Sequence, residues 1–452
     1  MSSTIAAIAT GAQVSAIGIV RLSGERAIEL VDTLFRPLSG RAMRDTPDRQ
    51  LVYGRLCDRK GELLDLCLCT VSRAPHSYTG EDTAELQCHG SPVLLRLVLE
   101  ELFALGARQA GPGEFTKRAF LNGCLELTSA EAVADLIDAE SAEAARNAAG
   151  QLSGAIGGKI DTIYRALTDI SSHYHAVLDY PDEDIEDFQL RSYASTLVGA
   201  EEQLNALLRS FERGRLLRSG LPCAIIGRPN AGKSSLLNAL LGYDRAIVTA
   251  VPGTTRDTVE EKLRLGKLTL RLIDTAGLRD TADEVERLGV ERSRAAMEAA
   301  GLLLLVIDSS EPLTDEDRAL LRRAERADKS VVVLSKGDLA PAVTELDTPL
   351  PVVGISARTG EGLDELERTI DALFPLPPVP AGEILTNARQ AEAIRRALES
   401  LSAAREAMEA GETPDIVLTE TERAMNALGE LTGRSIREDI TNRIFARFCV
   451  GK

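Results

Sequence analysis

The chain has no long hydrophobic run. Its longest, Leu302 to Ile307, falls far short of the roughly 20 apolar residues that a membrane-spanning helix needs. The N-terminus lacks the basic stretch and apolar core of a secretory signal. Cysteine is also scarce: 7 residues, an odd number, are scattered along the chain without the pattern of a disulfide framework. We therefore expect a soluble, cytoplasmic protein with reduced thiols and no membrane partner.

Positive charge is in short supply as well. The chain holds 52 Lys and Arg against 69 Asp and Glu, which gives a formal net charge of −17 at pH 7. This acidic balance argues against nucleic-acid binding over the whole surface and limits any RNA contact to a local patch. Hydrophobic residues, in contrast, make up 44% of the chain, which is enough for a core in every domain and excludes wholesale disorder.

The composition changes three times along the 452 residues, a length that suggests about three domains of ~150 residues each. Residues 1–118 carry short apolar runs and one helical stretch, Val93 to Leu105, a mixture typical of a small α+β domain. Residues 119–217 predict long helices, residues 218–376 alternate strands and helices as in a parallel α/β sheet, and residues 377–452 return to helical spacing. The predicted fold class is multidomain: an N-terminal α+β domain and a discontinuous helical domain interrupted by an inserted α/β domain.

A phosphate-binding loop follows the first apolar run of the inserted domain. Residues 227–234 read GRPNAGKS and separate a predicted strand at 221–226 from a predicted helix that begins at Ser235. This order of strand, loop and helix is the context that a P-loop requires, since its glycines let the backbone wrap phosphates at a helix N-terminus. Lys233 can reach the β- and γ-phosphates, and the Ser234 hydroxyl can bind Mg²⁺. The loop residues expected to contact GTP are Asn230, Ala231, Gly232, Lys233, Ser234 and Ser235.

Four further motifs follow in the order that GTPases use, most of them at predicted strand ends. Thr255 is a candidate second Mg²⁺ ligand, and Asp274 can hold the same ion through water. Asp338 can accept two hydrogen bonds from a guanine edge, and residues 356–358 can cover the base. Together with the P-loop these motifs predict a Ras-like GTPase domain. The GTP contacts expected from them are Thr255, Asp274, Thr275, Ala276, Gly277, Ser335, Lys336, Asp338, Ser356, Ala357 and Arg358.

One position departs from the usual base-binding motif, because Ser335 stands where most GTPases have Asn. A serine donates or accepts one hydrogen bond in place of a longer amide. We therefore expect weaker affinity for the base, with selectivity for guanine retained through Asp338.

Seven segments spread along nearly the whole chain carry recognisable motifs: residues 20–24, 77–82, 112–116, 118–123, 253–257, 274–279 and, most specifically, the terminal 448–452, FCVGK. Together they resemble the MnmE (TrmE) family of tRNA-modification GTPases. The resemblance implies a GTPase that works with the flavoprotein MnmG, which carries the FAD. Together they would add an aminomethyl or carboxymethylaminomethyl group to carbon 5 of the tRNA wobble uridine, using a one-carbon unit from a tetrahydrofolate. It also implies a homodimer through the N-terminal domain and a heterotetramer with MnmG.

The same resemblance implies a folate site in residues 1–118. Arg21, Glu85 and the terminal Lys452 match folate contacts, and Cys124 occupies a position where the family commonly has Lys. Cationic side chains suit the anionic glutamate tail of a folate. The resemblance also places Cys449 near the folate, where it is a catalytic nucleophile or redox thiol, or else an inert buried residue.

The resemblance further implies that K⁺ takes the place of the arginine that many GTPases receive from a partner, and that dimerisation of the GTPase domains completes the site. Asn230 matches a K⁺ ligand, as do the carbonyls of Thr249 and Val251 and the side chain of Thr254. Oxygen ligands are what a hard cation requires. Thr249 and Thr254 would also contact GTP. The alternative is that Asn230 only caps the loop, as Asn does in many turns.

Glu286 matches the family's catalytic carboxylate. The residue after Gly277 is Leu278, whose side chain cannot orient a water molecule, so another group is needed for that purpose. The alternative for Glu286 is a solvated helix face, the commoner place for a glutamate.

Two other functions remain open from the residues alone. One is a regulatory or ribosome-assembly GTPase whose extra domains only bind RNA or protein, although no basic RNA-binding module is visible. The other is a mechanical GTPase that moves helices by dimerising. Elsewhere, Cys67 and Cys69 share one strand face by their spacing, but a metal site there lacks a second pair of ligands, so we expect them and His89 to be structural.

Overall fold

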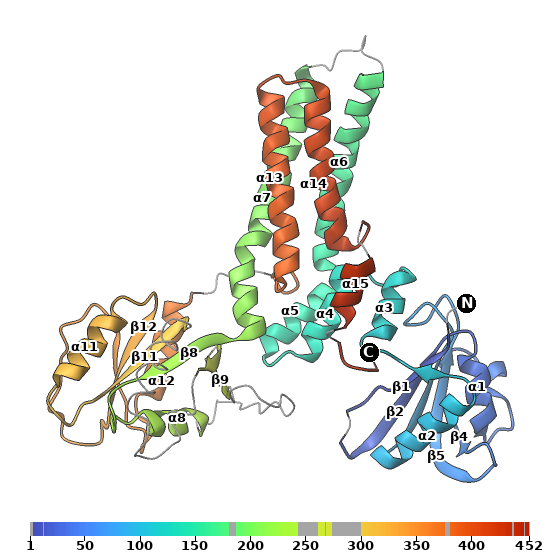
Figure 1. Ribbon diagram of the computed structural model, residues 1–452, viewed down its shortest axis with the longest axis horizontal. Coiled ribbons are helices and arrows are strands. Elements are labelled where there is room, and N and C mark those ends of the chain that lie inside the picture. Colours follow the sequence, from blue (N-terminus) through green and yellow to red (C-terminus); the bar gives the residue numbers. More distant parts are fainter. Residues whose placement is uncertain are drawn as a thin grey trace. The chain divides into compact units, whose positions relative to one another are not determined.

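The structure is a computed structural model, and it describes residues 3–11, 13–179, 187–242, 261–266, 268–273, 300–375, 380–435, 438–446 and 448–451 (Figure 1). The chain divides into two compact units. The first comprises Met1–Ile137, Ala148–Leu204 and Glu392–Lys452, and the second comprises Asp138–Asn147 and Asn205–Ala391. Among the described residues, no helix combines the length and the apolar composition needed to span a membrane.

The N-terminal part of the first unit is built on a seven-stranded sheet with the order β3-β4-β5-β6-β2-β1-β7. Its pairings are antiparallel except that between β1 and β7. Two of the short apolar runs, Ala16 to Leu22 and Leu64 to Val71, coincide with the long strands β2 and β5. The strands are β1 (Ile5–Ile8), β2 (Ser15–Ser23), β3 (Phe35–Pro37), β4 (Val52–Cys57), β5 (Leu63–Ser72), β6 (Thr83–Gly90) and β7 (Arg108–Gln109).

Helices α1 (Ala27–Leu34) and α2 (Pro92–Ala104) cover one face of this sheet, and their buried side chains share one core with the inward residues of the strands. Helix α2 begins where expected, because the Ser91 side chain accepts a hydrogen bond from the Leu94 amide at 3.5 Å. The prediction of only one helical stretch in residues 1–118 was wrong. Both α1 and α3 (Glu114–Leu121) have 8 residues, too few to display a helical repeat, and a 3₁₀ turn lies at Met43–Asp45.

The opposite, outer face of the sheet is only partly covered. Side chains alternate along β2, so that Val20 and Leu22 are buried against α1 and α2 while Ile17 is 57% exposed on the outer face. At the β1 edge, Phe115 of α3 packs on Ile5 and Ala7 and covers the outer face there. Helix α3 thus forms a wall along the β1 edge of this outer face.

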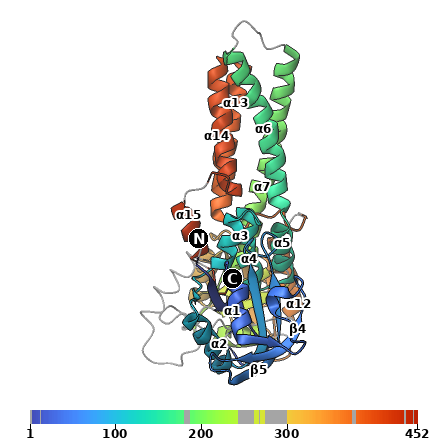
Figure 2. The ribbon, with the colours of Figure 1, turned by 90° about the vertical axis from the view of Figure 1, so that its right-hand side faces the viewer.

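The rest of the first unit is helical. Its longest helices are α6, α7, α13 and α14, and Figures 1 and 2 show them running side by side, with the chain leaving through α7 and returning through α13. Arg405 of α13 is paired with Glu201 of α7 at 3.1 Å. This arrangement confirms the predicted discontinuous helical domain. The helices are α4 (Leu127–Ile137), α5 (Ala142–Leu152), α6 (Ala155–Asp179), α7 (Asp187–Ser219), α13 (Ala388–Glu409), α14 (Pro414–Thr432) and α15 (Glu438–Phe445), of which α5, α7 and α13 extend into the second unit.

The second unit contains a six-stranded sheet with the order β13-β12-β11-β8-β10-β9, parallel except for β9. Helices α8 and α12 pack on one face and α11 on the other. Strands β10 and β11, which follow one another among the described strands, lie on opposite sides of β8. In such sheets, ligands bind at the carboxyl end of the strand between them. The elements are β8 (Leu221–Ile226), α8 (Lys233–Leu241), β9 (Glu261–Leu265), β10 (Leu268–Leu272), β11 (Leu302–Asp308), α11 (Asp315–Ala324), β12 (Ser330–Ser335), β13 (Val352–Gly354) and α12 (Leu363–Leu373).

Candidate functional site

The loop after β8 has the backbone of a phosphate cradle. Gly227 has φ of 155°, and a Cβ there would lie 2.3 Å from the carbonyl oxygen of Val306, so only glycine fits. Asn230, with φ of 62°, and Gly232, with φ of 94°, also take left-handed conformations. The loop therefore curls tightly over the N-terminus of α8, where backbone amides favour an anion.

Lys233 is the first residue of α8 and reaches back over this loop. Its ammonium donates to the carbonyl oxygens of Gly227 and Arg228, each at 2.8 Å. Burial lowers the pKa of the Lys233 ammonium from its usual value. The positive charge is thus held at the mouth of the cradle, where it can meet a phosphate.

Ser335, at the end of β12, ties the base-binding strand to the cradle. Its hydroxyl donates to the carbonyl oxygen of Ala231 at 2.6 Å and lies 3.2 Å from that of Ile307. The residue is buried, with 6% of its surface exposed. The serine that replaces the usual asparagine therefore holds the backbone of the P-loop by a hydrogen bond. Sequence reasoning did not identify this contact.

Three of the four residues predicted to read or cover a base come together. The Ser356 hydroxyl donates to Asp338 Oδ1 at 3.1 Å, and Arg358 Nη2 lies 2.5 Å from Asp338 Oδ2. A guanidinium presents N–H groups much as a guanine edge does. The Arg358 side chain is 73% exposed, so it can leave the carboxylate when a base arrives.

Lys336 holds in place the loop that joins Ser335 to Asp338. Its φ is 59°, and its ammonium lies 2.5 Å from Oδ2 of Asp308 at the end of β11. Burial alone would raise the pKa of the Asp308 carboxyl, but hydrogen bonds from Lys336 and Ser310 hold it below its usual value. The loop is thereby anchored to the strand beside the cradle.

Replacing Asp338 by Asn is expected to shift nucleotide preference from GTP to xanthosine triphosphate, because the amide NH₂ cannot accept from the guanine N–H groups. Hydrogen bonds to a charged group contribute ~1.5–3 kcal/mol each, so losing two corresponds to roughly 10²–10⁴-fold in relative affinity. Competition binding of the two nucleotides measures this change. Asp347→Asn, at an exposed aspartate of the same unit, is the matched control. Unaltered GTP affinity in Asp338→Asn would show that Asp338 does not read the base.

The predicted folate contacts of the N-terminal sheet also meet. Arg21 of β2 and Glu85 of β6 are partners in the strand register, and Nε of the arginine lies 2.8 Å from Oε1 of the glutamate. The Arg21 guanidinium stands 5.6 Å from the ring centre of Tyr78 and 5.8 Å from that of Phe115. The pair therefore lies on the outer face of the sheet, against the wall formed by α3.

Cys124 lies close to the loop at residues 77–82 that also carries Tyr78. A Cβ added to Gly80 of this loop would lie 3.0 Å from the Cys124 Sγ. The loop is held to α3, because Glu81 accepts from Arg118 at 2.7 Å. Cys124 is exposed, so the family's lysine at this position would be replaced here by an accessible thiol.

The C-terminal tail lies on the N-terminal domain. The Gly113 amide donates to the carbonyl oxygen of Cys449 at 3.2 Å, and Pro112 and Val450 form an antiparallel bridge. Gly451 has φ of 100°, and a Cβ there would lie 2.3 Å from the Ile8 carbonyl oxygen. Cys449 is exposed, so the alternative of a buried thiol was wrong.

A cavity of about 560 Å³ lies beside the tail, between α3 and α15. It was not predicted, although part of its lining belongs to the motif at 112–116. Burial would raise the pKa of the Glu114 carboxyl, but Arg108, the Gly111 amide and Arg118 lower it to about 2. Its polar lining residues include Glu81, Arg108, Glu114, Lys117, Arg118 and Asn442.

Several predicted site residues lie outside the described residues: Thr249, Val251, Thr254, Thr255, Asp274, Thr275, Ala276, Gly277, Glu286 and Lys452.

Two protein families match the chain. The family described as the MnmE helical domain matches residues 127–449, and the one described as the GTP-binding protein TrmE N-terminus matches residues 4–124. The protein described as tRNA modification GTPase MnmE of Symbiobacterium thermophilum is 44% identical over 99% of each chain. That of Geobacillus kaustophilus is 42% identical, again over 99% of each. The solved G domain of the T. maritima FeoB iron transporter is 29% identical over 34% of this chain and 97% of that one, with a TM-score of 0.25.

Proposed function

The chain belongs to the MnmE family and is a GTPase that acts in tRNA modification, and from that premise we propose that it supplies both nucleotide and folate chemistry for changing carbon 5 of the wobble uridine. The group added is of the aminomethyl or carboxymethylaminomethyl type. Residues 1–118 form the folate-binding, dimerising domain, residues 119–217 and 377–452 the helical domain, and residues 218–376 the GTPase domain. MnmG, which carries the FAD, is the partner, and a heterotetramer acts on tRNA in the cytoplasm.

In the GTPase domain, the β- and γ-phosphates sit in the cradle under Lys233, and Ser234 and Thr255 bind Mg²⁺. The support is the cradle itself, with its ammonium 2.8 Å from two loop carbonyls. Asp338 and the residues around it hold guanine. When Mg²⁺ is bound it neutralises charge that develops on the phosphates, while the chain's own groups orient the nucleotide.

K⁺ completes this site on Asn230 and on the oxygens of Thr249, Val251 and Thr254, and two GTPase domains pair across it. Asn230 is exposed at the cradle's rim and held in a left-handed conformation with φ of 62°, which suits a side chain that faces a ligand rather than the interior. Glu286 then positions the attacking water. A cation at this place stabilises the charge of the transition state as an arginine finger does.

GTP hydrolysis is expected to depend on K⁺ and to fall at least about tenfold in Na⁺, a fraction of the ~10³–10⁵-fold that an arginine finger contributes. Na⁺ is smaller and fits the same oxygen ligands poorly. Asn230→Ala is expected to remove the ion preference while sparing most nucleotide binding. Phosphate release in matched KCl and NaCl measures both. Equal rates of the unaltered protein in the two salts would contradict the K⁺ site.

The support for the folate site is a single observation: Arg21, Cys124 and the tail each lie against α3, its first turn or the loop before β6. Arg21 faces outward with aromatic rings on two sides, a setting that suits a flat pterin and an anionic tail. Lys452 follows directly on Gly451, which lies against the end of β1. The one-carbon unit is therefore presented close to Cys449.

A homodimer through the outer face of the sheet is supported by its uncovered apolar side chains. Ile17 is 57% exposed, Tyr53 48% and Leu66 42%, all on the face that also carries Arg21 and Glu85. Antiparallel sheets that face water usually place polar side chains there. A second copy that covers this face would also enclose the folate site.

Arg21→Ala is expected to weaken tetrahydrofolate binding to the full-length protein by at least about tenfold and to leave GTP hydrolysis unchanged. Truncating one partner of a hydrogen-bonded charge pair costs ~2–5 kcal/mol, and each 1.4 kcal/mol is about tenfold. Calorimetric titration measures the affinity. Arg59→Ala is the matched control, since Arg59 pairs with Glu101 at 2.7 Å in the same domain. A purely regulatory GTPase would bind no folate, so absence of binding to the unaltered protein would reject the proposed chemistry.

A further inference from the structure

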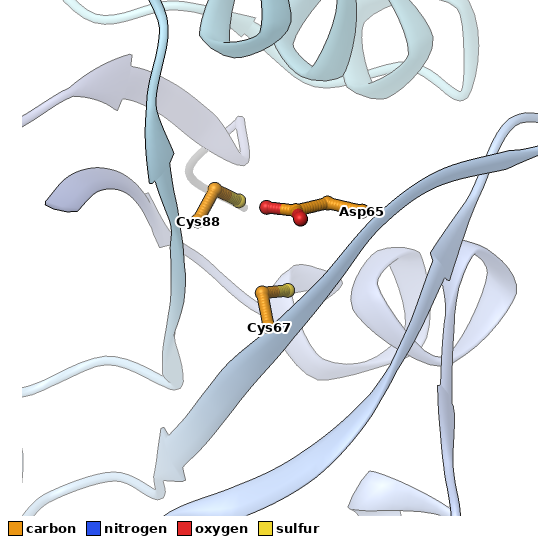
Figure 3. A group of neighbouring side chains, drawn as sticks. All are labelled: Asp65, Cys67 and Cys88. Carbon is orange, nitrogen blue, oxygen red and sulfur yellow. The ribbon is translucent and has the colours of Figure 1, made fainter. Parts of the chain in front are cut away.

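Three side chains with metal-binding atoms converge between strands β5 and β6. Asp65 and Cys67 come from β5, and Cys88 comes from β6 (Figure 3). The two strands are antiparallel neighbours, with Leu68 paired to Gln87, so the next residues, Cys67 and Cys88, stand opposite each other. One oxygen of the carboxylate and the two sulfur atoms all lie within 4.8 Å of one another.

These three groups face the core beneath α1 and α2. Cys67 is 4% and Cys88 2% exposed, and both belong to the core that includes Leu95 of α2. The Asp65 side chain is 8% exposed. Placing a carboxylate beside two buried thiols is unfavourable unless a partner compensates its charge.

His89 orients that carboxylate from the solvent side. Its Nδ1 lies 2.8 Å from Asp65 Oδ1, and its backbone amide donates to Asp65 Oδ2 at 2.9 Å. A second group that holds a ligating side chain in place is a regular feature of metal sites. The imidazole is 74% exposed, so it reaches the carboxylate without entering the core.

We propose that Asp65, Cys67 and Cys88 bind one thiophilic divalent cation of the Zn²⁺ class, with water in the fourth position. A tetrahedral zinc with sulfur at about 2.3 Å places two sulfur atoms about 3.8 Å apart. The two sulfur atoms lie at most 4.8 Å apart, so they need to approach each other by at most about 1 Å. Small rotations of the side chains supply such a movement. Binding releases the two thiol protons to solvent and leaves both cysteines as thiolates.

The mixed sulfur and oxygen ligands favour Zn²⁺ over Mg²⁺ and Ca²⁺, which prefer oxygen alone. The ion would join β5 to β6 on the core side of the sheet. Glu85 lies on β6 three positions before Cys88, and its side chain points to the other face. The site would therefore hold β6, the strand that carries Glu85, to its other neighbour β5.

The test is a titration of reduced, chelator-treated, full-length protein with Co²⁺ as a spectroscopic stand-in, followed by displacement with Zn²⁺. One equivalent per chain with a thiolate-to-cobalt charge-transfer band is expected, and Cys88→Ser is expected to lose that band. His89→Ala is expected to bind ~10–100-fold more weakly. Cys57→Ser, at a buried cysteine of β4 outside the cluster, is the matched control and keeps the band.

If circular dichroism shows that Cys88→Ser does not fold, Asp65→Asn decides, because it keeps the shape and removes the charge. It should weaken binding roughly tenfold or more. Unchanged affinity in Asp65→Asn, a band that survives in folded Cys88→Ser, or no uptake of Co²⁺ and Zn²⁺ would each overturn the proposal. Oxidation of Cys67 and Cys88 to a disulfide without metal uptake would identify a redox pair instead.

Discussion

A chain that ends at Phe448, without Cys449 to Lys452, is expected to leave tRNA without the wobble-uridine modification while hydrolysing GTP within a few-fold of the full-length protein. Chain ends are usually frayed and tolerate deletion. This end is different, because Cys449 and Val450 pair with the segment before α3 and Gly451 lies against the end of β1. The described residues of the tail therefore contact the N-terminal domain, which carries the proposed folate site.

A point substitution separates the position of the tail from its chemistry. In Gly451→Ala the new Cβ would lie 2.3 Å from the Ile8 carbonyl oxygen, so the tail must move although Cys449 and Lys452 remain. We expect modification to fall in this variant. Gly411→Ala is the matched control, since Gly411 also has a positive φ, of 70°, but a Cβ there meets nothing within 4 Å. Nucleoside analysis of tRNA measures the modification that the truncated chain, Gly451→Ala and Gly411→Ala each support.

Cys449→Ser then tests the thiol. If the sulfur reacts, the variant loses modification, and if the thiol only helps to seat the tail, the serine keeps most of it. Full modification by the truncated protein would show that the tail is a simple chain end.

Glu286→Ala is expected to bind GTP normally and to hydrolyse it ~10²–10⁴-fold more slowly, the contribution of a group that positions or deprotonates water. The expectation rests on the family match, because Glu286 lies outside the described residues. Single-turnover hydrolysis, with nucleotide affinity measured in parallel, separates the chemical step from binding. Glu284→Ala, in the same acidic run, is the matched control. If the rate of GTP hydrolysis falls by less than about threefold, Glu286 does not act on the water, and the alternative of a solvated glutamate on a helix face holds.

Much of the fold could be predicted because buried parallel strands appear as continuous apolar runs. The run at 221–226 coincides with β8, and the seven residues of β11 are all buried. Helix α8 followed the P-loop as expected. By contrast, β9 alternates charged and apolar residues at the sheet edge, and it gave no apolar run to recognise.

Contacts between distant segments could not be predicted, since they depend on strand register and tertiary packing. Nothing in the sequence pairs Cys67 with Cys88, whereas the register of β5 and β6 sets them opposite each other. The brace from Ser335 to Ala231 likewise appears only once β12 lies beside the P-loop. Family resemblance suggested the proposed roles of Arg21 and the tail, and the structure shows that both lie against the start of α3.

The most direct test of the account is nucleoside analysis of tRNA from cells that lack this gene. We expect the aminomethyl-type groups on carbon 5 of the wobble uridine to disappear and to return when the full-length chain is restored, but not when the chain carries Arg21→Ala together with deletion of Cys449 to Lys452. An unchanged set of wobble nucleosides in the deletion strain would contradict the claim that this GTPase modifies that base.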